Sequence, residues 1–247
     1  MSEAARRRII CVPPVVALGS KFDKYKPEEE KDVRKQEVTL DPVLEQLLKA
    51  WHRYRMPTAE PDRYYAALMD LHILKKTKYS AKDVERFSLL LGEYQNEANF
   101  PEKAGLFLSA LINRGKDRTY VIHTRHLTMP PEQLGFMNKK NIIVEGDVGD
   151  AVGHVMAGGT ITVNGNAGDS VGEGMGPGTI TVNGNAGWGI GESMEGGTIT
   201  VNGDGGDSIG LHMTDGEIYV AGNLGKLDIN GIESGKIYHK GKLIVDK

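Results

Sequence analysis

Two residues near the N-terminus of this 247-residue chain have side chains that could act as nucleophiles. Cys11 is the single thiol, and it lies in an apolar stretch broken by Pro13 and Pro14, where an inert cysteine is favoured over a reactive one. Ser2 could react after removal of Met1, but the sequence supplies no base or oxyanion group beside it. Neither residue therefore predicts a catalytic site.

The histidines are candidates for metal ligation. His123 and His126 are three residues apart in an expected strand and loop, while His154 and His212 lie further along the chain. A metal site needs several ligands at fixed spacing, each held by supporting groups, and the sequence fixes no third ligand here. We expect surface or capping histidines rather than a metal site.

Acidic residues recur regularly in the second half of the chain, at Asp147, Asp150, Asp169, Asp204 and Asp207. Calcium prefers a cluster of hard oxygen ligands, but Asn166, Asn185 and Trp188 interrupt these columns. A solvated face or a surface for a protein partner is therefore favoured. The candidate partner face consists of Asp150, Asp169, Trp188 and Asp207. We predict no catalytic residue, no cofactor-binding residue and no metal ligand in this chain.

These acidic residues belong to a repeat, since Gly146 and Gly165 begin successive copies 19 residues apart. In four copies the glycines follow the pattern G-x-x-G-x-x-x-G. We expect structural glycines, because glycine permits positive φ and a close approach of neighbouring coils; they are Gly146, Gly149, Gly153, Gly165, Gly168, Gly172, Gly184, Gly187, Gly191, Gly203, Gly206 and Gly210. The pattern is not a nucleotide-binding fingerprint, because no helix follows the glycines.

One segment of each repeat has the pattern of a strand. Thr160-Ile161-Thr162-Val163 alternates polar and apolar β-branched residues, and the same four residues recur at 179–182 and 198–201. Stacked strands would bury Ile161 on Ile180 in a parallel β-helix, with about 4.8 Å of rise per coil. The methionines Met156, Met175, Met194 and Met213 keep the same period, and we expect them to fill the interior.

The repeated motif resembles a known family of domains. The segments GDVGDAVGHVMAGGTITVNGNAGDSVGEGM, from Gly146 to Met175, and GNAGWGIGESMEGGTITVNG, from Gly184 to Gly203, are similar to the GXGXG domain. This domain ends the large subunit of glutamate synthase and forms much of one subunit of formylmethanofuran dehydrogenase. The resemblance covers residues 135–245 and implies a right-handed β-helix with a scaffolding role. It also implies that chemistry belongs to neighbouring subunits, which would carry flavin, an iron–sulfur cluster or a metal-pterin.

Charge and composition divide the chain into two parts. Residues 1–140 hold 25 Lys+Arg and 19 Asp+Glu, a net +6, and residues 141–247 hold 5 and 14, a net −9, which sum to −3. We predict an α+β protein of two units, a small helical domain followed by the right-handed parallel β-helix. The expected ranges are an extended arm at 1–39, the helical domain at 40–118, a connector and β-helix cap at 119–140, and about six 19-residue coils at 141–247.

Four helices are expected in the helical domain. The first helix begins at Asp41-Pro42 and the second covers residues 61–76. The third begins at the Ser80–Asp83 capping pair, and the fourth covers residues 101–114 and ends before Gly115. At the other end of the chain, Lys236, Lys240, Lys242 and Lys247 would protect the open edge of the last coil.

The sequence thus favours a non-catalytic scaffold subunit that docks to catalytic subunits of a cytoplasmic oxidoreductase complex. A stand-alone homo-oligomeric scaffold or ligand-binding β-helix is the alternative. Expected partners are proteins, including further copies of the chain; the net charge argues against a nucleic-acid partner. No apolar run reaches the ~18 residues of a membrane span. Arg6–Arg8 and the apolar stretch after them are expected to form a retained cytoplasmic arm.

Overall fold

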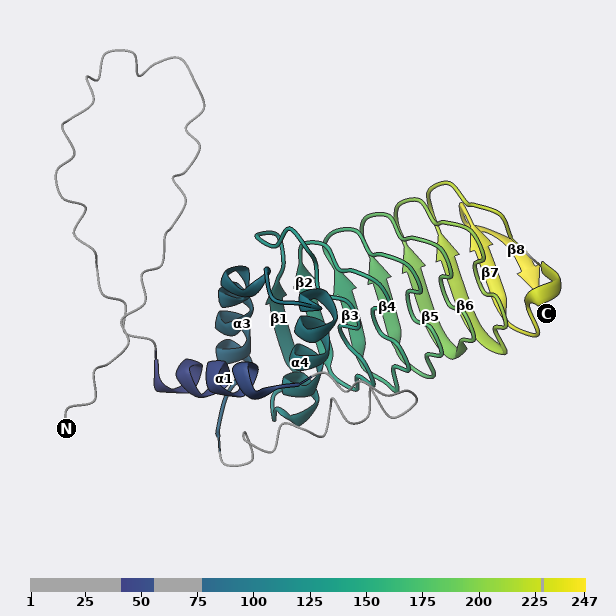
Figure 1. The fold of residues 1–247 in the computed structure, drawn as a ribbon. Coiled ribbons are helices and arrows are strands. Elements are labelled where there is room, and N and C mark those ends of the chain that lie inside the picture. The colour runs from purple at the N-terminus through teal and green to yellow at the C-terminus, as the bar shows by residue number, and fades with distance from the viewer. Residues whose placement is uncertain (1–40, 56–76, 228) are drawn as a thin grey trace, which may run out of the picture. The chain divides into compact units, whose positions relative to one another are not determined.

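The computed structural model describes residues 41–55, 77–227 and 229–247 (Figure 1). Val43–Lys247 form one compact unit, distinct from Met1–Pro42, so the change of composition near residues 135–141 falls inside a unit. The arm expected at 1–39, which contains Ser2 and Cys11, and the helix expected at 61–76 lie outside the described residues. Within the described ranges, the helices are too short or too polar to cross a membrane.

The described helices are α1 (Pro42–Arg53), α3 (Ala81–Leu90) and α4 (Phe100–Arg114), with a short 3-10 helix, η2 (Leu91–Tyr94), after α3. The predicted capping box is present: Ser80 Oγ accepts from the Asp83 N–H, and Asp83 Oδ2 accepts from the Ser80 N–H at 2.8 Å. Gly115 follows α4 as predicted, but its φ of −64° is not the left-handed conformation that glycine commonly adopts after a helix. A side chain there would overlap the hydroxyl of Tyr120.

An aromatic cluster joins the helices. Trp51 of α1 is fully buried, with its ring centroid 6.3 Å from that of Phe87 in α3 and 5.4 Å from that of Phe107 in α4. The Lys103 ammonium lies 4.0 Å from the indole centroid and 2.7 Å from Glu97 Oε2, so its charge is paired despite burial. Contacts between residues so far apart in sequence fix the helices to one another.

The rest of the unit is a parallel β-solenoid of about six turns. Its strands are β1 (Thr119–His123), β2 (Asn141–Glu145), β3 (Thr160–Val163), β4 (Thr179–Val182), β5 (Glu195–Val201), β6 (Asp215–Val220), β7 (Lys236–His239) and β8 (Lys242–Asp246). They form one sheet in chain order; β1 to β7 are parallel and β8 is antiparallel to β7 (Figure 1).

Strand register follows the sequence repeat. Asn141 pairs with Thr160 and Thr160 with Thr179, an offset of 19 residues, but Thr119 pairs with Asn141 at an offset of 22. The segment expected to be a connector therefore contains the first strand of the sheet. Gly135 continues the Gly153 column into this first coil, but it precedes Gly153 by 18 residues rather than 19, so the 19-residue period does not include it.

The interior of the solenoid is built from stacked identical residues. The isoleucine column, Ile142, Ile161, Ile180, Ile199, Ile218 and Ile237, is at most 1% exposed. The four methionines of the repeat, Met156, Met175, Met194 and Met213, are buried to the same degree, which confirms that they fill the interior. The predicted stacking of equivalent strands is confirmed by the register.

The glycine columns have the two expected causes. Gly172 has φ +69°, and its equivalents Gly153, Gly191 and Gly210 are also left-handed. Gly187 does not have positive φ; instead, a Cβ there would overlap Asp169 Oδ1 and lie 3.0 Å from Asp169 N. Real Cβ atoms rarely come so close to the backbone of a neighbouring coil, so this column fixes the spacing between coils.

Both ends of the sheet are covered. At the β1 edge, the His123 N–H donates to Ser88 Oγ of α3 at 3.0 Å. At the other end β8 folds back on β7, and Lys247 Nζ donates to the carbonyls of Ile229 and Ile232 at 2.7 and 2.8 Å. The solenoid edge is thus closed by a helix at one end and by a hairpin at the other.

Replacing Gly187 with valine should lower the free energy of unfolding by about 3 kcal/mol, because the coils cannot separate to admit the side chain. Asp169→Ala, which removes one side-chain acceptor, should cost only about 1 kcal/mol. Urea denaturation followed by circular dichroism measures both changes. Equal losses for the two variants would contradict the packing role of this glycine column.

Candidate docking surface on the solenoid

The candidate partner face is a column of equivalent residues on successive coils. We call Asp150, Asp169, Trp188 and Asp207 the docking column; each follows its predecessor by 19 residues. Asp150 Oδ1 accepts from the Asp169 N–H at 2.9 Å, and Asp169 Oδ1 accepts from the Trp188 N–H at 3.0 Å. The carboxylates therefore tie each coil to the next.

A neighbouring column does the same with mixed side chains. The Asp147 column contains Asp147, Asn166, Asn185 and Asp204, and each side-chain Oδ1 accepts from the backbone N–H one coil later, at 2.6 to 2.9 Å. An amide oxygen replaces a carboxylate oxygen in this role. This explains why asparagine interrupts the acidic columns without a change of backbone.

Trp188 is the exception in the docking column. Its side chain has no acceptor oxygen and is 48% exposed, whereas its N–H is held by Asp169 and its carbonyl accepts from the Ser170 N–H at 2.7 Å. The following residue, Gly189, has φ +73°. A large apolar ring is therefore presented to solvent from a fixed backbone.

The surface around Trp188 is acidic. Asp169 and Asp207 precede and follow it in the column, and Asp207 Oδ1 accepts from the Lys226 N–H at 2.7 Å. At the helical end of the column, burial raises the pKa of Glu132, and the nearby Asp150 carboxylate raises it further. The column thus combines an exposed apolar ring with neighbouring carboxylates.

The aspartates do not gather into a metal site. Among the residues that the structure describes, no group of three or more histidine, cysteine, aspartate or glutamate side chains could hold a metal ion.

Of the four candidate histidines, His123 and His126 lie near each other, and His154 and His212 lie elsewhere on the solenoid. His123 Nε2 lies 3.3 Å from Glu85 Oε1 beside α3, and burial followed by the charge of His123 lowers the pKa of His126. His154 Nδ1 lies 3.1 Å from Gln133 Oε1, and burial lowers its pKa. His212 is exposed, and its N–H donates to the Gly231 carbonyl at 2.7 Å.

A second feature was not identified from the sequence. A cleft of about 700 Å³ lies where α4 meets the first coil, and its lining residues are Asn113, Arg118, Met137, Lys139, Lys140 and Asn141. A signal for it does exist in the sequence. By strand register, Lys140 is equivalent to Gly159, Gly178 and Gly197 of the later coils.

The fold and its exposed column define a β-solenoid protein with an acidic face. Comparison of the sequence with models of protein families and with curated proteins gives no match.

His154 predicts a pH dependence of stability. Its folded-state pKa is lowered, so below the ordinary value of about 6.5 the unfolded chain takes up the proton first and folding stability falls. Between pH 7 and pH 5.5 the wild type should lose more stability than His154→Gln, by a fraction of the roughly 1.4 kcal/mol per pH unit that one proton can contribute. Urea midpoints at both pH values measure this difference. Parallel pH profiles for the two proteins would contradict it.

Proposed function

We propose that this protein is a non-catalytic scaffold subunit whose docking column binds a catalytic subunit of a cytoplasmic oxidoreductase complex. Its solenoid would be the right-handed β-helix of the GXGXG domain, acting in a complex of the glutamate synthase or formylmethanofuran dehydrogenase kind. Flavin, iron–sulfur cluster or metal-pterin would be carried by the partner. The repeated sequence motif between Gly146 and Gly203 supports this assignment.

The exposed Trp188 is the observation on which the proposal rests. Tryptophan is enriched among the few residues that dominate binding energy at protein interfaces, because it buries a large area when it enters a pocket. Its backbone is already fixed by bonds to the preceding coil, at Asp169 and Ser170. Little conformational entropy would be lost when a partner binds.

The carboxylates beside Trp188 would select the partner. Asp150, Asp169 and Asp207 each use Oδ1 within the ladder and place their charge on the same face. Opposite charges on a partner would speed association and exclude acidic surfaces. Binding through this column should therefore weaken as the salt concentration rises.

Affinity capture from native extract tests the proposal. Tagged wild-type protein at moderate salt should retain flavin, iron–sulfur or metal-pterin subunits in fixed ratio, identified by mass spectrometry. Trp188→Ala should reduce their recovery by about tenfold or more, as expected for a central interface residue. The loss should exceed that from Asp207→Asn, which preserves an oxygen acceptor for the ladder.

Thr181→Ala is the matched control, because Thr181 lies in β4, seven residues before Trp188, but on the outer face of the sheet. It should leave partner recovery unchanged. Wild-type protein that is recovered alone, with the mass of a homo-oligomer by light scattering, would overturn the scaffold proposal in favour of a stand-alone rod.

A further inference from the structure

The cleft at the start of the solenoid is lined by three cationic side chains. Asn113 comes from the end of α4, Arg118 precedes β1, and Lys139 and Lys140 precede β2. The cleft is open to solvent and has a volume of about 700 Å³, which lies in the range of small-molecule sites.

Register places two of these cations side by side. Thr119 pairs with Asn141, so Arg118 and Lys140 occupy adjacent positions one residue before their strands. The Asn141 N–H donates to the Arg118 carbonyl at 2.8 Å, which holds the two backbones together. Like charges on neighbouring strands are destabilising unless a counter-charge lies between them. Register therefore places two positively charged residues at adjacent positions in the wall of the cleft.

In the later coils this position is glycine for a backbone reason, because Gly159 has φ +73° and a Cβ there would overlap the Lys140 carbonyl. The Thr160 N–H donates to the Lys140 carbonyl at 3.0 Å, and the Thr179 N–H donates to the Gly159 carbonyl at 3.1 Å. Lys140 and Gly159 are thus equivalent, and Gly159 has no side chain to cover the cleft. A cationic side chain at this position therefore occurs at Lys140, which lines the cleft, and is replaced by glycine at Gly159, Gly178 and Gly197.

The cations lack counter-charges in the described part of the chain. Its ion pairs involve Lys82, Arg86, Lys103, His123 and Arg125, and Arg118, Lys139 and Lys140 form none there. Asp117, which is next to Arg118 in sequence, accepts instead from the Ala81 N–H at the start of α3. The positive charge of the cleft is left for a ligand.

The cleft wall is also fixed in place. Asn138 is fully buried; its Nδ2 donates to the Lys140 carbonyl at 2.7 Å, and its Oδ1 accepts from the Lys140 N–H at 3.0 Å. Asn141 Oδ1 accepts from the Thr160 hydroxyl at 3.1 Å, which leaves its amide NH2 as a donor. The backbone at Lys140 is therefore fixed before binding, which lowers part of the entropic cost of holding a ligand.

We propose that this cleft binds a phosphate group, carried by a small organic molecule or present as inorganic phosphate. Arg118 offers a planar fork of donors and Lys140 a compact charge, a combination suited to the oxygens of a phosphate. Lys139 and the Asn141 amide complete the donor set, and Met137 provides an adaptable apolar surface for an organic body. The site does not depend on the docking column.

Calorimetric titration of the full chain at low salt tests the site. The probes are inorganic phosphate, glucose 6-phosphate and ADP, with glucose, adenosine and citrate as comparisons. The phosphate compounds should bind and glucose and adenosine should not. Tighter binding of the organic phosphates than of inorganic phosphate assigns an organic ligand, and equal binding assigns inorganic phosphate itself.

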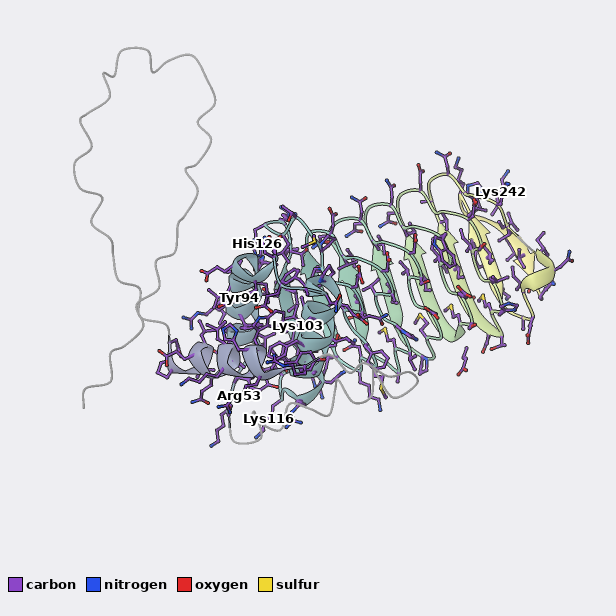
Figure 2. The ribbon with its side chains drawn as sticks, viewed as in Figure 1. Arg53, Tyr94, Lys103, Lys116, His126 and Lys242 are labelled. Atoms are coloured by element: carbon purple, nitrogen blue, oxygen red, sulfur yellow. The ribbon has the colours of Figure 1, made fainter. Side chains whose placement is uncertain are left out.

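Lys140→Gln and Arg118→Gln should each weaken phosphate binding by about tenfold or more, since each removes a charged donor. Lys242→Gln is the control, because Lys242 lies at the C-terminal end of the solenoid, away from the helical end that contains Lys103 and His126 (Figure 2). It should change nothing, and urea midpoints should show that all three variants fold. Absence of phosphate binding, equally tight binding of citrate, or an equal loss in Lys242→Gln would overturn the proposal.

Discussion

The spacing between coils is the constraint on which the rest of the structure depends. Parallel strands pair only when successive coils lie about 4.8 Å apart, and each coil must repeat the backbone path of the one before it. The offset of 19 residues from Asn141 to Thr160 to Thr179 satisfies that condition. Glycine appears where a side chain would force coils apart, as at Gly187, and identical apolar residues stack where side chains point inward.

The same constraint decides what the polar residues do. Side-chain oxygens in the docking column and the Asp147 column accept from the next coil, and Asn183 Nδ2 donates to Asn164 Oδ1 at 2.8 Å in a third ladder. Residues that could be taken for metal ligands or acid–base groups thus hold the coils together. The side chains of Trp188 and of the cleft cations are different, because within the described residues they are not part of these ladders. For that reason the two proposals rest on them.

The regular part of this fold could be predicted from the sequence, because strand, turn and glycine residues recur at the same positions in successive repeats. The isoleucine and methionine columns and the Ser80–Asp83 capping box follow from local patterns. The strand that contains His123 was expected and is confirmed as β1, but its place as the first strand of the solenoid sheet could not be predicted, because its offset of 22 residues breaks the period. The antiparallel β8 and the cleft beside Arg118 depend on how the ends of the solenoid are closed. The repeated sequence contains no information about these ends. For the candidate site, the sequence predicted the column but not the carboxylate ladder within it.

Hydrogen–deuterium exchange of the chain alone and in the complex recovered from native extract tests the central claim most directly. If a catalytic partner docks on the column, residues 185–189 and their equivalents one coil before and after should gain protection on binding. The outer face of β3 to β5, which includes Thr181, should keep its exchange rates. Protection confined to that outer face or to the β8 end, or no change along the column, would contradict the account.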